Sequence, residues 1–386
     1  MKALAITSVR LIRFRTETVK EKDSDGHDHP CAPRPTTLAL LSIDTDAGVT
    51  GEVLCPPSVL RAELLEAYIR PILLDQNPFD RERLWQAMAR WQRGAAQQLT
   101  DKAIGYVDHA LWDLAGKALG LPVWRLIGGA RNKVPAYGST MCGDERKEGL
   151  ATPEDYGHFA EALVARGYQA IKLHTWMPPV SWAPSVRMDI AACAAVREAV
   201  GSDIALMLDA NHWYSRTEAL TLGRGIEALG YLWYEEPMEE ASTSSYRWLS
   251  QQLSIPVIGP ESAPGKHFTR AEWAASGACD VLRTGVNDVG GITPAIKCVH
   301  LAQSFNMEIE VHGGGVGNLA LIGGTGAGRY YERGLLHPFL DHDAPPPHLT
   351  AIPDPMDADG LVHLSEAPGL GDALDRDFIA ANTLPD

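Results

Sequence analysis

A regular alternation that begins near residue 134 constrains the fold more than any other feature of the sequence. Short apolar runs alternate with helix-like segments, and the runs cover residues 134–140, 169–174, 204–209, 231–235, 255–259, 280–284, 307–311 and 328–332. Strands that alternate with helices form a parallel sheet, because each parallel connection must cross over. Eight such units favour a (β/α)₈ barrel over an open doubly wound sheet. No G-x-G-x-x-G follows a first strand, which counts against a dinucleotide-binding fold.

The first 133 residues follow a different pattern. Residues 1–14 and 37–55 are rich in β-branched and apolar residues and predict strands, and helices dominate from about 59 to 120. Between the two strands, residues 16–36 are polar, charged and rich in proline, which predicts a long loop. Loops of this length in compact proteins are usually functional lids or disordered segments, and we interpret this one as a lid.

Composition limits the partners and the compartment. The formal net charge of −15 argues against nucleic acid or an anionic membrane as the main partner. The six cysteines are widely spaced and form no C-x-x-C pair, which suits reduced thiols. The start of the chain shows no secretion signal, and no apolar run reaches membrane-spanning length. We therefore expect a cytoplasmic protein that acts on a small molecule.

Three acids stand at the ends of successive predicted strands. Asp209, Glu235 and Glu261 are spaced 26 residues apart, which is one β/α unit each. Strand ends converge on one mouth of a barrel, so these carboxylates should meet and would repel each other without a cation. Oxygen ligands without cysteine or clustered histidine select a hard ion, Mg²⁺ before Zn²⁺. Taken singly, each acid also fits a helix cap or a solvated turn.

The predicted strand 169–174 carries Lys172 and His174 among apolar neighbours. Residues two apart on a strand point to the same face, so both side chains should reach the same side of the mouth. Two interpretations stay open. The pair belongs to the reaction, or Lys172 neutralises a barrel carboxylate and His174 fills space.

The order of several motifs resembles the enolase superfamily, in its mandelate racemase / muconate lactonizing enzyme-like branch. They are "DHALWDLAGKALGLPVWRLIGG", "GYQAIKLH", "LMLDAN", "YEEP", "IPVIGPES", "GGIT", "VHGGG" and "DADGLVHLSEAPGLG". The resemblance spans nearly the whole chain. It implies a barrel over 134–350 and a capping domain built from 1–133 and the tail 351–386. It also implies Mg²⁺ held by Asp209, Glu235 and Glu261, with the lid closing over the mouth.

The family abstracts a proton next to a carboxylate, and the resemblance assigns the groups that do so. Its second strand usually ends in Lys-x-Lys, whereas this chain has Lys172 and then His174, which takes the place of the base. Its eighth-strand acid, which hydrogen-bonds the enediolate, corresponds to Glu332.

Many relatives carry a His–Asp dyad on strands seven and six. His312 matches the histidine, but the aspartate position, 285, is glycine. Asn287 or Asp288 are candidate substitutes. Without a carboxylate on its other nitrogen, His312 would be less basic and less firmly oriented, which favours a general acid over a second base.

One base facing an acid describes β-elimination, so we expect a sugar-acid dehydratase that forms a 2-keto-3-deoxy acid. An epimerase, racemase or cycloisomerase would use the same enediolate, and a non-catalytic metal-dependent sugar-acid binding protein is a third possibility. The resemblance also allows a homo-oligomer. Side chains near the mouth that could read the substrate hydroxyls are His27, His29, Trp176, Asn211, His212 and Asn287.

Overall fold

The computed structural model describes residues 4–24, 26–95 and 98–385. Its N-terminal part contains an antiparallel three-stranded sheet in the order β1 (Ile6–Lys22), β2 (Asp28–Thr45) and β3 (Thr50–Cys55). A helical layer follows, made of α1 (Ala62–Leu64), the π-helical turn η1 (Leu65–Ile69), α2 (Arg70–Leu73), α3 (Arg81–Gly94), α4 (Asp101–Leu119) and α5 (Val123–Ile127). Apolar side chains from this sheet and from helices up to α4 share one buried core.

The prediction of a long loop over residues 16–36 is wrong. Strands β1 and β2 pair from Ile6 and Thr45 out to Lys22 and Asp28, so this segment is a long β-ribbon with a short turn. β3 pairs only residues 39–44 of β2. Beyond them β2 is an edge strand on that side, where prolines cost no ladder hydrogen bond. The Pro-rich composition therefore indicated a loop where the chain forms an extended ribbon.

Eight parallel strands form the second part, in the hydrogen-bonded order β10-β9-β8-β7-β6-β5-β4-β11. Their bounds are β4 (Lys133–Thr140), β5 (Ala170–His174), β6 (Ala205–Asp209), β7 (Trp233–Glu235), β8 (Val257–Gly259), β9 (Val281–Thr284), β10 (Glu308–Val311) and β11 (Tyr331–Leu336). The predicted (β/α)₈ architecture is confirmed, although no ladder joins β10 to β11 within the described residues.

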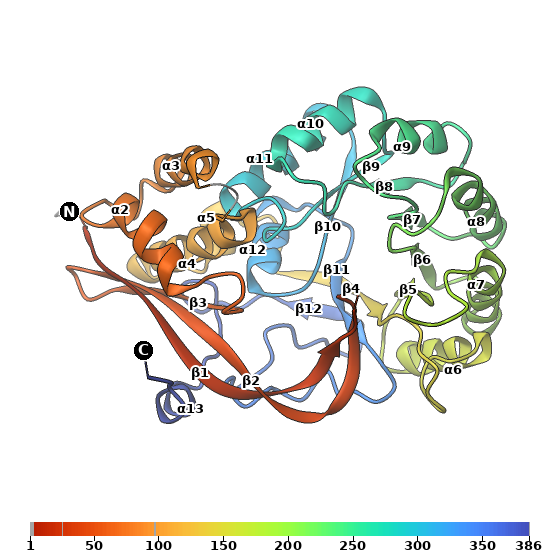
Figure 1. Cartoon of the computed structure of the whole chain (residues 1–386), viewed down its shortest axis with the longest axis horizontal. Helices are drawn as coiled ribbons and strands as arrows, with labels where there is room; N and C mark the ends of the chain where they lie inside the picture. The colour runs from red at the N-terminus through yellow and green to blue at the C-terminus, as the bar shows by residue number, and fades with distance from the viewer. Residues whose placement is uncertain (1–3, 25, 96–97, 386) are drawn as a thin grey trace.

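Helices form an outer arc around these strands (Figure 1). They are α6 (Pro153–Ala165), α7 (Val186–Val200), α8 (Arg216–Ala228), α9 (Thr243–Ser250), α10 (Lys266–Ser276), α11 (Ile292–Ser304) and α12 (Val316–Thr325). A capping box formed by Thr152 and Asp155 begins α6. The parallel strands all end on the same side of the sheet, so the loops that lead from them to these helices gather at one mouth.

The C-terminal tail returns to both parts of the molecule. Strand β12 (Leu361–His363) pairs antiparallel with β4. Helix α13 (Arg376–Ala381) lies beside β1, where the backbone N–H of Leu384 donates to the carbonyl of Arg13 over 2.8 Å. The tail thus contacts both parts of the molecule, and the domain bounds given from the sequence stay predictions.

Two remaining expectations can be compared with the structure. All six cysteines are free thiols, as their spacing predicted. Among the residues described, no helix combines the length and the hydropathy needed to cross a bilayer.

Candidate active site

Three carboxylates meet at the mouth of the barrel. Asp209 and Glu235 are the last residues of β6 and β7, where they pair in register, and Glu261 lies two residues after β8. One oxygen of each lies within 4.8 Å of the other two, and all three residues are buried. The three equally spaced acids are therefore brought together, as predicted. Their role as metal ligands stays a prediction.

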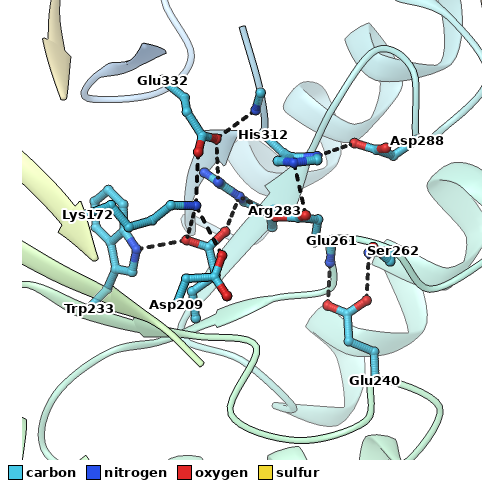
Figure 2. Close-up of polar contacts among 12 residues, drawn as sticks. Lys172, Asp209, Trp233, Glu240, Glu261, Ser262, Arg283, Asp288, His312 and Glu332 are labelled. Atoms are coloured by element: carbon cyan, nitrogen blue, oxygen red, sulfur yellow. Dashed lines mark hydrogen bonds and ion pairs between the residues drawn. The ribbon is translucent and has the colours of Figure 1, made fainter. Parts of the chain in front are cut away.

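Two buried cations lie beneath this triad. Lys172 Nζ lies 3.2 Å from Asp209 Oδ2, 3.2 Å from Glu235 Oε2 and 3.1 Å from Glu332 Oε1. Arg283, from β9, places Nε 2.6 Å from Glu235 Oε1 and Nη2 3.0 Å from Glu332 Oε2 (Figure 2). Arg283 was not predicted as a site residue, although a charge inside the apolar run "VLRT" is the same kind of signal as Lys172 in its strand.

The charges of this cluster suit a divalent cation. Four carboxylates face the two cations Lys172 and Arg283, so two negative charges are in excess; the acids are Asp209, Glu235, Glu261 and Glu332. Burial and the neighbouring carboxylates of Asp209 and Glu261 raise the pKa of Glu235 to about 8, so Lys172 and Arg283 compensate the charge of this acid only in part. An all-oxygen donor set with this excess charge fits Mg²⁺.

Further side chains hold the triad in place. Both oxygens of Glu240 accept backbone N–H groups, from Glu261 at 2.5 Å and from Ser262 at 2.7 Å (Figure 2). Trp233 donates its indole N–H to Glu235 Oε2 at 3.1 Å. Glu240 was not predicted, because nothing in "EEPMEE" distinguishes one acid from the next. Hydrogen bonds of this kind orient ligands before an ion binds.

His174 lies at the Asp209 end of the triad. Its Nδ1 is 2.7 Å from the carbonyl oxygen of Thr140, and its Nε2 is 3.0 Å from Asp209 Oδ2. Lys172 and His174 therefore do point to one side, as the strand alternation predicted. The structure supports part of each open interpretation, since Lys172 neutralises barrel acids while His174 presents Nε2 to the site.

His312 lies at the Glu261 end of the triad. Its Nε2 is 2.9 Å from Glu261 Oε1, and its Nδ1 is 2.7 Å from Asp288 Oδ2 (Figure 2). Burial alone would lower the pKa of His312, but Glu261 and Asp288 raise it well above its usual value. Of the two candidate substitutes, Asn287 and Asp288, it is the carboxylate of Asp288 that lies on Nδ1, beside Gly285.

Glu332 is engaged from several sides. It accepts from Lys172 and Arg283, and the backbone N–H of Gly313 donates to Glu332 Oε2 at 2.7 Å. Burial would raise the pKa of Glu332, but Lys172 and Arg283 lower it well below its usual value. The hydrogen bond expected between Glu332 and an enediolate stays a prediction. The contacts of Glu332 favour the positioning of Lys172 and Arg283.

The tip of the ribbon carries two candidate substrate residues. His27 Nδ1 and His29 Nε2 lie 3.3 Å and 2.8 Å from the same oxygen, Asp23 Oδ2. The ribbon reaches toward β4 and β5 in Figure 1. Asp23 and His29 line a cavity of about 390 Å³ together with residues of the β4–α6 and β5–α7 loops. The tip is therefore placed near the barrel mouth, where a lid is expected.

Of the remaining substrate candidates, three are at least partly exposed and one is fully buried. Asn211 donates its backbone N–H to Asp209 Oδ1 at 3.0 Å, and His212 stacks on Trp213 at the surface. Asn287 is half-buried in the loop that carries Asp288. Trp176 is a correction, because it is 0% exposed and its indole N–H donates to the Leu150 carbonyl. This leaves Trp176 no surface for a substrate.

Comparison with known proteins places this site in a family. The profile described as "Enolase C-terminal domain-like" matches residues 155–378. The profile described as "Mandelate racemase / muconate lactonizing enzyme, N-terminal domain" matches residues 32–128. The chain belongs to the enolase superfamily, in its mandelate racemase-like branch. The resemblance stated from the sequence is confirmed.

Known proteins resemble the chain over three quarters of its length or more. A crystal structure of D-glucarate dehydratase from Agrobacterium tumefaciens, complexed with magnesium, has a TM-score of 0.98 and 58% sequence identity and covers 100% of both chains. D-galactarolactone cycloisomerase of Agrobacterium fabrum is 30% identical over 99% of this chain and 100% of its own length. Arabinonate dehydratase of Saccharolobus solfataricus is 31% identical over 76% of each chain.

Proposed function

We propose that this enolase superfamily member is a Mg²⁺-dependent sugar-acid dehydratase that forms a 2-keto-3-deoxy acid. The observation that carries the proposal is the placement of His174 and His312 at opposite ends of one buried carboxylate triad. Support comes from the 58% identity, over the whole chain, to a protein described as D-glucarate dehydratase in complex with magnesium. The 31% identity to arabinonate dehydratase points to the same reaction class.

Each residue of the site has a separate role in the proposed reaction. Asp209, Glu235 and Glu261 would hold Mg²⁺, which supplies electrostatic stabilisation to the charge that develops on the substrate carboxylate. His174 Nε2 removes the α-proton as general base, while the Thr140 carbonyl holds Nδ1–H. His312 donates a proton to the β-hydroxyl, which leaves as water. The resulting enol tautomerises to the 2-keto acid.

An epimerase or a cycloisomerase is the second candidate, and one contact favours it. His312 keeps a carboxylate partner, Asp288, so it is oriented and basic enough to act as a second base opposite His174. Exchange of the α-proton between two faces requires such a pair. The 30% identity to D-galactarolactone cycloisomerase, over 99% of this chain, supports this alternative.

A screen of sugar acids separates these functions. The protein is incubated with Mg²⁺ and a library of aldonic and aldaric acids, D-glucarate first, in deuterated solvent. Formation of a 2-keto acid supports the dehydratase. Epimers, ring-opened lactones or Cα deuterium without any keto acid would instead establish the second candidate. If no compound reacts or takes up deuterium, catalysis is unsupported, and the result favours a non-catalytic metal-dependent sugar-acid binding protein.

We also infer that the ribbon formed by β1 and β2 is the lid of this site and acts in substrate choice. Its histidines His27 and His29, with Asn211, His212 and Asn287, are the side chains we propose to contact the substrate beyond the triad. A metabolic role of this kind fits a cytoplasmic enzyme with a small-molecule partner rather than nucleic acid or membrane. Assembly into a homo-oligomer stays a prediction.

A further inference from the structure

The partner of His312 comes from a loop rather than from a strand end. The family resemblance implies the dyad aspartate at position 285, where this chain has glycine. The carboxylate that meets His312 Nδ1, at 2.7 Å, belongs to Asp288 in the loop between β9 and α11 (Figure 2). The side chain thus arrives from three residues further along.

Position 285 has no room for a side chain while Asp288 occupies this place. A Cβ atom built on Gly285 would lie 2.1 Å from Asp288 Oδ2 and 3.0 Å from the carbonyl oxygen of His312. The first distance is far inside van der Waals contact. Gly285 does not adopt a positive φ, so the backbone conformation itself does not demand glycine. Glycine is needed here because the carboxylate of Asp288 fills the space of the missing side chain.

Backbone hydrogen bonds turn the loop back toward the histidine. The N–H groups of Asp288 and Val289 donate to the carbonyl of Gly285, at 3.0 Å and 3.2 Å. This tight turn returns the Asp288 side chain to the end of the strand that the chain has just left. The geometry of the loop therefore matches the vacancy at position 285.

Asn318, on α12, ties the two halves of this arrangement together. Its Oδ1 accepts the N–H of Val286 at 3.1 Å, and its Nδ2 donates to the carbonyl of His312 at 2.7 Å. Asn318 is buried, so both hydrogen bonds lie in a site with little competing water. One side chain thus fixes the distance between the loop that carries Asp288 and the strand end that carries His312.

We propose that Asp288 is the positioning residue of His312 and that glycine at position 285 is part of the same device. The dyad carboxylate has moved from the strand to the loop, and the strand position has lost its side chain to admit it. Asp288 holds the Nδ1–H of His312 and so directs Nε2 toward the reacting centre. The catalytic consequence rests on the proposed function, whereas the arrangement of the side chains does not.

Removal of the carboxylate is the first test. In Asp288→Ala we expect kcat to fall by about 10–100-fold, as for other partners that orient catalytic histidines, with KM changed by less than about threefold. Magnesium affinity, measured by calorimetry, should stay within about threefold of wild type, because Asp288 does not touch the triad directly. Asp203→Asn, on the exposed surface at the start of β6, is the control and should match wild type.

A structural readout accompanies the kinetics. In ¹⁵N-histidine NMR spectra, the hydrogen-bonded Nδ1 proton of His312, assigned with His312→Asn, should be visible in wild type and absent in Asp288→Ala. If Asp288→Ala does not fold, Asp288→Asn takes its place, since the amide keeps the volume but loses the charge. The NMR result does not require any substrate.

Relocation of the carboxylate is the decisive test. In the double variant Gly285→Asp/Asp288→Ala, the first substitution places the carboxylate at the strand end. The second removes the side chain that would clash with it. We expect this double variant to regain at least about tenfold in kcat over Asp288→Ala and to recover the Nδ1 proton signal. Gly285→Ala alone should displace Asp288 and behave like Asp288→Ala, whereas Gly94→Ala, whose Cβ meets open space, should be neutral.

Two outcomes would overturn the proposal. One is a folded Asp288→Ala that keeps kcat and the Nδ1 proton of wild type. The other is a folded double variant that restores neither of them. If wild type itself turns over no sugar acid, the proposed function fails, and the NMR comparison still decides whether Asp288 positions His312.

Discussion

The Nδ1 atom of His174 lies 2.7 Å from the carbonyl oxygen of Thr140. A carbonyl oxygen only accepts hydrogen bonds, so Nδ1 carries a proton and donates it. Nε2 lies 3.0 Å from Asp209 Oδ2 and so faces the triad. The backbone at the end of β4 thus fixes the ring orientation of a residue on β5, with Nε2 as the nitrogen placed to exchange protons with a substrate.

Loss of this imidazole should stop the reaction while leaving the metal site intact. For His174→Ala we expect kcat to fall by about 10²–10⁴-fold, the usual contribution of a positioned general base. Magnesium affinity should stay near that of wild type, because the triad carboxylates remain. His158→Ala, an exposed histidine on α6, is the matched control. Loss of magnesium binding in His174→Ala would mean that the base has been misplaced.

Glu240 should act on metal affinity rather than on the chemical step. In Glu240→Gln the amide cannot accept the N–H groups of Glu261 and Ser262 with both of its polar atoms, so the Glu261 backbone shifts. We expect the Kd for Mg²⁺ to rise by about 10–100-fold. The neighbouring exposed acid provides the control Glu239→Gln. Equal magnesium titrations for Glu240→Gln and wild type would contradict this role.

The ribbon is held to the barrel by Arg146. This side chain donates to the carbonyl of Pro30 on β2, and its Nη2 lies 3.5 Å from Glu21 on β1. In Arg146→Ala we expect KM to rise by about threefold to tenfold, with a smaller change in kcat. A tenfold change corresponds to about 1.4 kcal/mol, which is the size of one lost hydrogen bond. Lys147→Ala, at a 92% exposed side chain, is the control. An unchanged KM would argue against a lid function for the ribbon.

Asp189 makes stability depend on pH. This aspartate on α7 accepts the hydroxyl of Tyr214, and burial raises its pKa from 3.8 to about 7. The folded state therefore holds the proton more tightly than the unfolded state, so the stabilisation is present below about pH 4 and is lost as the pH rises to about 7. The difference between the unfolding free energies of wild type and Asp189→Asn should fall across this range. The fall is at most about 1.4 kcal/mol for each unit by which folding raises the pKa of Asp189. Denaturant titrations from about pH 4 to about pH 8 measure it, and a flat difference would contradict the assignment.

The sequence predicts the barrel well because its signal repeats. Eight apolar runs each end within a few residues of an observed strand end, and acids placed at those ends, such as Asp209 and Glu235, necessarily face one mouth. Lys172 and His174 followed from strand alternation alone. The family resemblance added the expected capping part and the metal.

What the sequence did not predict depends on contacts between distant segments. Asp288 could not be chosen over Asn287, because the choice depends on a turn that brings one carboxylate back into the space beside Gly285. Glu240 acts by accepting backbone N–H groups, which leaves no pattern in a single sequence. The ribbon was mistaken for a loop because proline shows only that a backbone N–H is missing. It does not show whether a neighbouring strand needs that N–H for pairing.

The ribbon that we propose as the lid is one paired unit. Its two strands stay paired from the three-stranded sheet to the tip near the barrel mouth, and the register changes between Thr18 and Lys20, where a bulge gives the strands a joint. A paired ribbon moves as one stiff body on either side of such a joint. The tail contacts β1 at Arg13 and Arg15, before this bulge, so the last residues of the chain brace the base of the proposed lid rather than its tip.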